Sequence, residues 1–169
     1  MIAGKPISLI GMPGSGKSTV GVLLAKRLGF DFVDTDLLIQ ARENATLAEI
    51  IARTDHQYLR DLEERVLLEM PIEHGVISTG GSVVYSPAIM ARLGAATTLV
   101  YLRARVETVT YRISLAPDRG IASPGGHTLE DIYAERVPLY ERYADITVDA
   151  DDEPPETIVG HIIAALDTL

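Results

Sequence analysis

The chain has 169 residues, the length of one domain, with a formal net charge of −9 and no cysteine. The lack of cysteine excludes a disulfide framework and a thiolate metal site. The negative charge argues against a nucleic-acid-binding surface, which needs clustered Lys and Arg. No apolar stretch approaches the roughly 18 residues that span a bilayer. We therefore expect a cytoplasmic protein that binds neither nucleic acid nor membrane. We also expect a monomer.

The first half of the chain alternates between short apolar segments and segments whose apolar residues recur at the spacing of one helix face. Gly29 is suited to end a helix, and Thr46 and Glu49 have the spacing of a capping box, which starts one. The predicted elements, in chain order, are a strand over 7–10, a helix over 19–28, a strand over 30–33, a short helix from Thr46 and a helix over 58–70.

The second half continues this alternation. Pro87 is tolerated in the first turn of a helix, whereas Pro138 predicts an irregularity within one. The Gly- and Pro-rich segment 116–127 is predicted to be a mobile loop. The predicted elements are a strand over 76–78, a helix over 87–94, a strand over 97–102, a helix over 106–115, a helix over 128–143, a strand over 146–148 and a helix over 157–166. The alternation predicts an α/β fold with a parallel sheet covered on both faces, in one domain over residues 1–169.

A glycine-rich motif directly follows the first predicted strand. Residues 11–18, Gly-Met-Pro-Gly-Ser-Gly-Lys-Ser, fit G-x-x-x-x-G-K-[ST] at every fixed position and open the next predicted helix. Its glycines would let backbone N–H groups surround phosphate oxygens, and the helix N-terminus would add its positive dipole. Lys17 would reach the β- and γ-phosphates, and the Ser18 hydroxyl would bind Mg²⁺. We predict that ATP and Mg²⁺ bind here, to Gly11, Gly14, Ser15, Gly16, Lys17, Ser18 and Thr19.

This motif predicts a nucleoside triphosphate but not a reaction. The guanine-reading Asn-Lys-x-Asp motif of GTPases does not occur in the chain, and motor or helicase ATPases usually need a longer chain. A short chain with a mobile loop late in the sequence favours a kinase of a small metabolite. The alternative is a nucleotide-binding module that has lost phosphotransfer.

Two carboxylates follow the second predicted strand, at the sheet edge where open α/β folds bind ligands. If this segment is extended, Asp34 and Asp36 point the same way. One could hold Mg²⁺ through water, and the other could orient the proton of the acceptor hydroxyl. In the simpler interpretation, one of them only caps a helix that begins at Leu37.

Arg60 and Arg136 lie on predicted helices that are far apart in the sequence. A guanidinium group matches a carboxylate bidentately, so two that converge would select an anionic substrate. From the residues alone, each is more often a surface ion-pair arginine. The glycines of segment 79–81 would let backbone approach a ligand closely, unless this is a plain turn. Arg119, in the predicted mobile loop, could close over the phosphates, unless it is simply a loop arginine.

Together these motifs resemble the shikimate kinase family over nearly the whole chain. The residues that carry the resemblance are the phosphate loop, Asp34-Thr35-Asp36, Arg60, Gly80-Gly81, Arg119, Glu135-Arg136-Val137-Pro138-Leu139-Tyr140 and Ala144-Asp145. The combination of Asp-x-Asp with E-R-x-P-L-Y is much more specific than the phosphate loop. The resemblance implies a three-layer P-loop kinase with a parallel five-stranded sheet flanked by helices, a helical substrate-binding segment near 37–65 and a lid near 116–127.

The resemblance also implies an activity and a role for each candidate residue. The chain would use ATP to phosphorylate a hydroxyl of a small carboxylate metabolite, with shikimate as the first choice. The implied catalytic residues are Lys17, Asp36 and Arg119, and the implied metal-binding residues are Ser18 and Asp34. Arg112 would lie near the adenine, and Arg119 would reach the phosphates from the lid. The acceptor would be held by Asp36, Arg60, Gly80, Gly81 and Arg136, with both arginines on its carboxylate.

Departures from the family pattern cluster on the acceptor side. They are Ser82 for a third glycine, Arg119-Gly120-Ile121-Ala122 for Arg-Pro-Leu-Leu, Ile51 and Leu59 for phenylalanines beside the acceptor ring, and Asp55-His56 for a Gly-Glu pair. A less aromatic pocket could favour an acyclic hydroxy acid such as homoserine. We keep shikimate first because the expected acceptor residues all remain.

Overall fold

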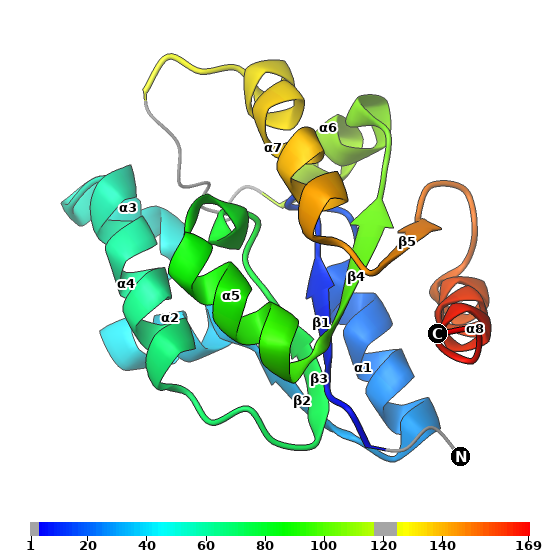
Figure 1. The fold of residues 1–169 in the computed structure, drawn as a ribbon. Coiled ribbons are helices and arrows are strands. Elements are labelled where there is room, and N and C mark those ends of the chain that lie inside the picture. Colours follow the sequence, from blue (N-terminus) through cyan, green and yellow to red (C-terminus); the bar gives the residue numbers. More distant parts are fainter. Residues whose placement is uncertain (1–3, 117–124) are drawn as a thin grey trace.

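A computed structural model of the chain describes residues 4–116 and 125–169. Its strands form one parallel sheet in the order β2-β3-β1-β4-β5, so that the first strand lies in the middle (Figure 1). Each connection between parallel strands has to cross over the sheet, and helices provide these crossovers. The strands are β1 (Ile7–Ile10), β2 (Asp31–Asp34), β3 (Gly75–Ser78), β4 (Thr98–Arg103) and β5 (Ile146–Asp149).

Helices cover both faces of this sheet and make three layers (Figure 1). They are α1 (Lys17–Leu28), α2 (Thr35–Glu43), α3 (Leu47–Arg53), α4 (His56–Glu69), α5 (Pro87–Ala96), α6 (Val106–Ser114), α7 (Leu129–Tyr143) and α8 (Pro155–Leu166). Residues of α1 and α8 share one core, and residues of α4, α5 and α7 share the other. Leu99, Val100 and Tyr101 of β4 belong alternately to the two cores, which explains why the strands are apolar throughout. The expected three-layer α/β fold is confirmed.

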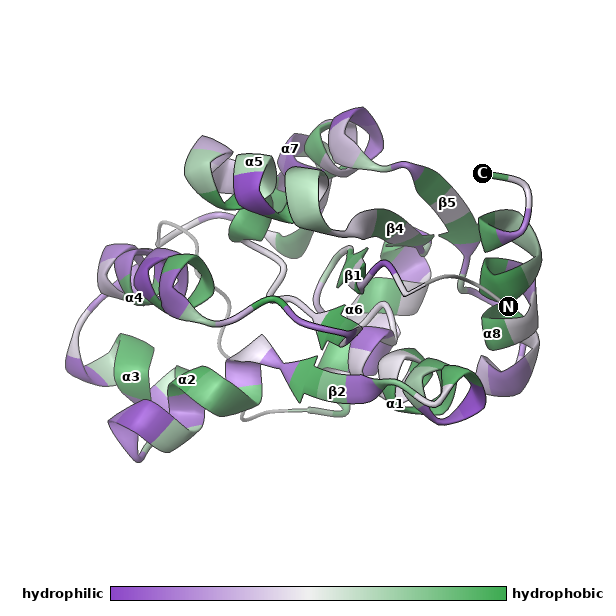
Figure 2. Cartoon of the chain, turned by 60° about the horizontal axis from the view of Figure 1, so that its bottom comes forward, coloured by the Kyte–Doolittle hydropathy of each residue, from purple (hydrophilic) through white to green (hydrophobic). Residues whose placement is uncertain are grey.

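A third apolar cluster joins α2, α3 and α4 into a helical unit. Its buried residues are Ile39, Leu47, Ile50, Leu59, Leu62 and Val66. The capping box that starts α3 is present, because Thr46 and Glu49 each accept a hydrogen bond from the other's backbone N–H. Figure 2 shows hydrophobic stretches in the strands and long hydrophilic stretches along α4. The segment predicted to bind substrate, near 37–65, is thus largely helical.

Some element boundaries differ from the expectation. α2 begins at Thr35, directly after β2, because the Asp34 side chain accepts hydrogen bonds from the backbone N–H groups of the next turn. The expectation that this segment is extended is therefore wrong. α5 continues past Gly94 to Ala96, and α7 runs through Pro138. A short 3-10 helix, η1 (Val83–Tyr85), follows β3 and was not predicted.

The predicted lid falls mainly on residues 117–124, which lie outside the described residues. Arg119 and the departures at 120–122 are therefore not placed. Within the part of the chain that the structure describes, no helix combines the length and the apolar character needed to cross a bilayer.

Candidate active site

A cavity of about 220 Å³ is lined by residues that follow β1, β2 and β3, at the edge where open α/β sheets bind ligands. What we call the donor side is lined by Gly14, Gly16, Lys17, Ser18, Thr19 and Arg112. The acceptor side is lined by Asp36, Glu63, Gly80, Gly81, Ser82 and Arg136. The structure therefore brings most of the predicted site residues together. Gly11, Ser15, Asp34 and Arg60 do not line this cavity.

The phosphate loop, residues 11–18, is closed by its own lysine. Lys17 Nζ donates hydrogen bonds to the carbonyl oxygens of Gly11, at 2.8 Å, and Met12, at 2.9 Å. Ser15 Oγ is buried and has no hydrogen-bond partner among the described residues. This hydroxyl lies beside Gly11 and does not line the cavity, so a bound phosphate would meet the backbone N–H groups of the loop instead. The loop thus fits the phosphates of ATP at the N-terminus of α1.

Arg112 links the phosphate loop to the segment that follows the edge strand β5. Gly14 and Gly16 have φ angles of 81° and 97°, which glycine adopts without a steric penalty. One guanidinium nitrogen of Arg112 donates to the carbonyl of Gly14 at 3.2 Å. The other donates to the carbonyls of Ala150, at 3.0 Å, and Asp151, at 3.2 Å. Arg112 therefore contacts the phosphate loop directly, and its position near the adenine stays a prediction.

Ser18 and Asp34 form a pair of oxygen-bearing side chains beside the loop. Ser18 Oγ donates to Asp34 Oδ2 at 2.6 Å. Asp34 Oδ1 accepts from the backbone N–H groups of Asp36, at 2.9 Å, and Leu37, at 3.2 Å. Asp34 thus caps α2 with one oxygen, although the helix begins at Thr35 and not at Leu37, and faces Ser18 with the other. Mg²⁺ at phosphate sites is held by a few protein oxygens together with phosphate oxygens and waters, and this pair fits that chemistry.

Arg60 and Arg136 converge on the ring of Tyr85, a residue of η1 that sequence reasoning missed. Arg136 is only 1% exposed, so the surface ion-pair interpretation is wrong for it. Its Nε donates to Tyr85 Oη at 3.4 Å. The guanidinium carbons of Arg60 and Arg136 lie 4.2 Å and 5.3 Å from the centre of the Tyr85 ring. Arg60 lines a smaller cavity, which shares Glu63 and Ser82 with the main one.

Glu63, on α4, is a buried carboxylate that no motif predicted. Its Oε1 accepts a hydrogen bond from Ser82 Oγ at 2.8 Å. Burial, and then the negative charge of Asp36, raises the pKa of Glu63 to about 7. The hydrogen bond from Ser82 and the positive charges of Arg136 and Arg60 act in the opposite direction, but they are smaller. Glu63 therefore changes its charge near neutral pH.

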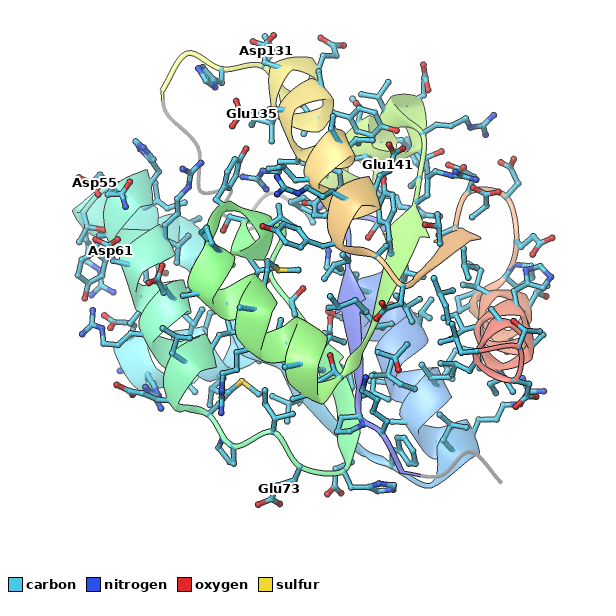
Figure 3. All side chains as sticks on the ribbon, viewed as in Figure 1. Asp55, Asp61, Glu73, Asp131, Glu135 and Glu141 are labelled. Atoms are coloured by element: carbon cyan, nitrogen blue, oxygen red, sulfur yellow. The ribbon has the colours of Figure 1, made fainter. Side chains whose placement is uncertain are left out.

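The position of Glu63 is exceptional among the acidic residues. Figure 3 labels exposed acidic side chains, namely Asp55, Asp61, Glu73, Asp131, Glu135 and Glu141. Among the acidic side chains of residues 4–116 and 125–169, only Glu63 is buried. The sequence carried one signal, because position 63 lies one helical turn after Leu59 on the apolar face of α4.

The Gly80–Gly81 turn after β3 lies so close to the charged groups that it has no room for side chains. A Cβ atom at Gly80 would collide with Glu63 Oε2 and lie 2.9 Å from Asp36 Oδ1. A Cβ atom at Gly81 would lie 2.7 Å from Pro13 Cδ and 2.9 Å from a guanidinium nitrogen of Arg136. This close approach explains both glycines better than a plain turn does.

Comparison with known proteins identifies the family. The family model described as Shikimate kinase matches residues 13–167. The chain belongs to the shikimate kinase family. It is 38% identical to the shikimate kinase of Mycobacterium avium (strain 104), over 94% of this chain and 91% of the relative. It is 34% identical to the shikimate kinase of Caldanaerobacter subterraneus subsp. tengcongensis, over 95% of each chain. The chain is thus a small-molecule kinase.

Solved structures of shikimate kinases share this fold. The shikimate kinase of Acinetobacter baumannii in complex with shikimate has a TM-score of 0.90 and 27% identity, covering 98% of this chain and 94% of that one. The shikimate kinase of Aquifex aeolicus vf5 has a TM-score of 0.82 and 31% identity, covering 96% of each chain. The resemblance inferred from the motifs is confirmed.

The structure places several departures from the shikimate kinase pattern. Ser82 Oγ donates a hydrogen bond to Glu63, so the hydroxyl that replaces the family's glycine at this position lies on the acceptor side. Leu59 lines the cavity, whereas Ile51 packs against the third apolar cluster. Asp55 caps α4. Of these placed departures, Ser82 and Leu59 line the cavity.

Proposed function

We propose that the chain transfers the γ-phosphoryl group of ATP to a hydroxyl of shikimate, giving shikimate 3-phosphate and ADP. The main support is that one cavity joins the phosphate loop to Asp36 and to the buried Arg136. A phosphate cradle at one side and a guanidinium group with a carboxylate at the other fit a hydroxy acid as acceptor. The Acinetobacter baumannii relative is described in complex with shikimate.

The donor side would bind ATP with Mg²⁺. Lys17 would bind the β- and γ-phosphates, and Ser18 and Asp34 would hold Mg²⁺, whose charge stabilises the phosphate oxygens. Arg112 would flank the nucleotide at the mouth of the loop. Arg119, outside the described residues, is our proposed lid residue for the phosphates.

The acceptor side would bind and orient the hydroxy acid. Arg60 and Arg136 would hold its carboxylate, and the backbone of Gly80–Gly81 would lie against it. Asp36 would take the proton of the hydroxyl. The hydroxyl oxygen then bonds to the γ-phosphorus while the bond to the bridging oxygen of ADP breaks, and the proton passes from Asp36 to solvent. The proposed enzyme is a monomer, and its use of ATP supports a cytoplasmic location.

Homoserine is the second candidate acceptor, because Leu59 makes the cavity less aromatic than the family pattern. An ADP-release assay with shikimate, homoserine and gluconate distinguishes the two, and we expect the highest kcat/KM with shikimate. Lys17→Ala and Asp36→Ala are the negative controls and should lose turnover. If shikimate is inert and homoserine is phosphorylated, homoserine replaces shikimate as the proposed acceptor, and the proposed phosphotransfer stands. ATP binding without any acceptor-dependent ADP release would instead favour a non-catalytic nucleotide-binding module.

A further inference from the structure

The hydrogen bond between Ser82 and Glu63 fixes a carboxylate inside the acceptor side. Both side chains are nearly inaccessible, at 6% and 5% exposed. Glu63 Oε1 is held by the Ser82 hydroxyl. Its Oε2 approaches Gly80 from the same side as Asp36 Oδ1, since both oxygens lie within 3 Å of the position of a Cβ atom there. The two carboxylates therefore meet at the turn that lines the cavity.

The charged groups that act on Glu63 come from three helices. Asp36 comes from α2, Arg60 from α4 and Arg136 from α7. Tyr85 of η1 lies against both arginines, and Lys17 of α1 lines the same cavity. The ammonium group of Lys17 is directed to the loop carbonyls of Gly11 and Met12. Among the charges that act on Glu63, its own negative charge and that of Asp36 balance the two guanidinium groups when Glu63 is ionised. An acceptor carboxylate would add an uncompensated negative charge in a poorly solvated place, where such charges interact strongly.

We propose that binding of the acceptor carboxylate is coupled to uptake of a proton by Glu63, and that Ser82 sets the pH at which this occurs. The inference rests on the proposed function, because it concerns the same acceptor. A protonated Glu63 restores the balance, since the acceptor carboxylate then takes its place beside Arg60 and Arg136. Ser82 donates to the ionised form of Glu63 and therefore opposes this uptake.

The direction of the effect follows from the charges. The pKa of Glu63 is about 7 without acceptor, so the group is mainly ionised above neutral pH. A bound carboxylate raises this pKa further, because it disfavours the ionised form. Acceptor affinity should therefore fall as pH rises above 7, by up to about tenfold per pH unit for one linked proton. The acceptor's own carboxylic acid is already ionised throughout this range.

Isothermal titration calorimetry with shikimate tests the coupling in the wild-type chain. Titrations near pH 8 in two buffers of different ionisation enthalpy report the number of protons taken up. We expect a large fraction of one proton per shikimate bound. Binding with no proton uptake, or with proton release, would overturn the inference and leave the proposed function standing. If shikimate gives neither a binding heat nor ADP, the proposed function fails, and this inference fails with it.

Variants of both residues assign the proton to its site. Glu63→Gln should abolish the uptake and remove the pH dependence of shikimate affinity between about pH 6 and 9. In Ser82→Ala, the affinity for shikimate should begin to fall at a pH about one unit higher than in the wild type. The reason is that ionised Glu63 loses a hydrogen bond, which raises the pKa of Glu63. Ser82→Thr keeps the hydroxyl and should retain the wild-type profile. Proton uptake that persists in Glu63→Gln, or a Ser82→Ala profile identical to the wild type, would overturn the assignment.

Discussion

The burial of Glu63 also affects the stability of the chain, apart from any part in binding. The carboxyl group has an ordinary pKa of 4.5 and a pKa of about 7 in the folded chain. The folded state therefore holds this proton more tightly than the unfolded state does. The resulting contribution to stability is fully present below pH 4.5 and is lost as the pH rises through 7.

We expect Glu63→Gln to be more stable than the wild type at alkaline pH. The free energy of unfolding at about pH 8 should rise by roughly 2–3 kcal/mol, because a neutral amide does not have to be ionised in a buried place. The gain should shrink as the pH falls towards 5. Urea unfolding of both proteins across this range measures it, and Glu73→Gln, at an exposed position, is the control. A difference between the two proteins that is the same at every pH would contradict this account.

The proposed binding of the acceptor carboxylate can be tested at Arg60. Removing one partner of a buried charge pair typically costs about 2–5 kcal/mol, so we expect the KM for the acceptor to rise at least about 30-fold in Arg60→Ala. The KM for ATP should stay close to that of the wild type. Steady-state kinetics with each substrate varied measures both constants. Arg65→Ala, an exposed arginine on the same helix, should change neither. Unchanged acceptor kinetics in Arg60→Ala would exclude the proposed carboxylate clamp.

At the scale of elements, the start of α2 combines structure with chemistry. The capping oxygen of Asp34 fixes where the helix begins, and this start places Asp36 in its first turn. The other oxygen of Asp34 faces Ser18. Asp34 therefore has two roles. It fixes the start of α2 and with it the position of Asp36, and it contributes an oxygen to the proposed metal site.

Two substitutions of Asp34 should separate these roles. Asp34→Asn keeps a good capping group, so we expect a free energy of unfolding within about 0.5 kcal/mol of the wild type. Asp34→Ala should lose about 1 kcal/mol with the cap. Both variants should need more Mg²⁺ for half-maximal activity, because both lack the carboxylate. Urea unfolding and Mg²⁺ titrations of the rate measure the two effects. An Asn variant with the Mg²⁺ dependence of the wild type would rule out a metal role for Asp34.

Most elements were predictable because their signals are local. Apolar runs marked the strands, and capping patterns such as Thr46 with Glu49 marked helix starts. The start of α2 was missed because Asp34 and Asp36 fit two interpretations, an extended strand end or a helix cap. Only the backbone geometry distinguishes them. η1 was missed because its short segment has no periodicity.

At the scale of the whole molecule, the parallel sheet brings distant segments together. The phosphate loop, Asp36 and the Gly80–Gly81 turn were predictable as neighbours, because each follows a parallel strand and all such strands end at one edge. Glu63 and Tyr85 were not predictable as site residues. Their positions depend on how α4 and η1 pack, and no local pattern determines that packing.

Ligand binding to the folded chain provides a test at this scale. A ligand that binds only the folded state stabilises it by mass action, by about 2.7 kcal/mol at a hundred times its Kd. We expect ATP with Mg²⁺ to raise the Tm clearly, and ATP with EDTA to raise it less. Thermal unfolding followed by fluorescence measures the shift. In Lys17→Ala the shift should be largely lost. Equal shifts with and without Mg²⁺ would contradict the proposed metal site.

The contacts of Lys17 with the carbonyls of Gly11 and Met12 have a consequence for nucleotide binding. Fixing the backbone of a loop costs conformational entropy, and these two hydrogen bonds help to fix it from within the chain itself. Less of that entropy then has to be lost when a triphosphate binds, which favours affinity.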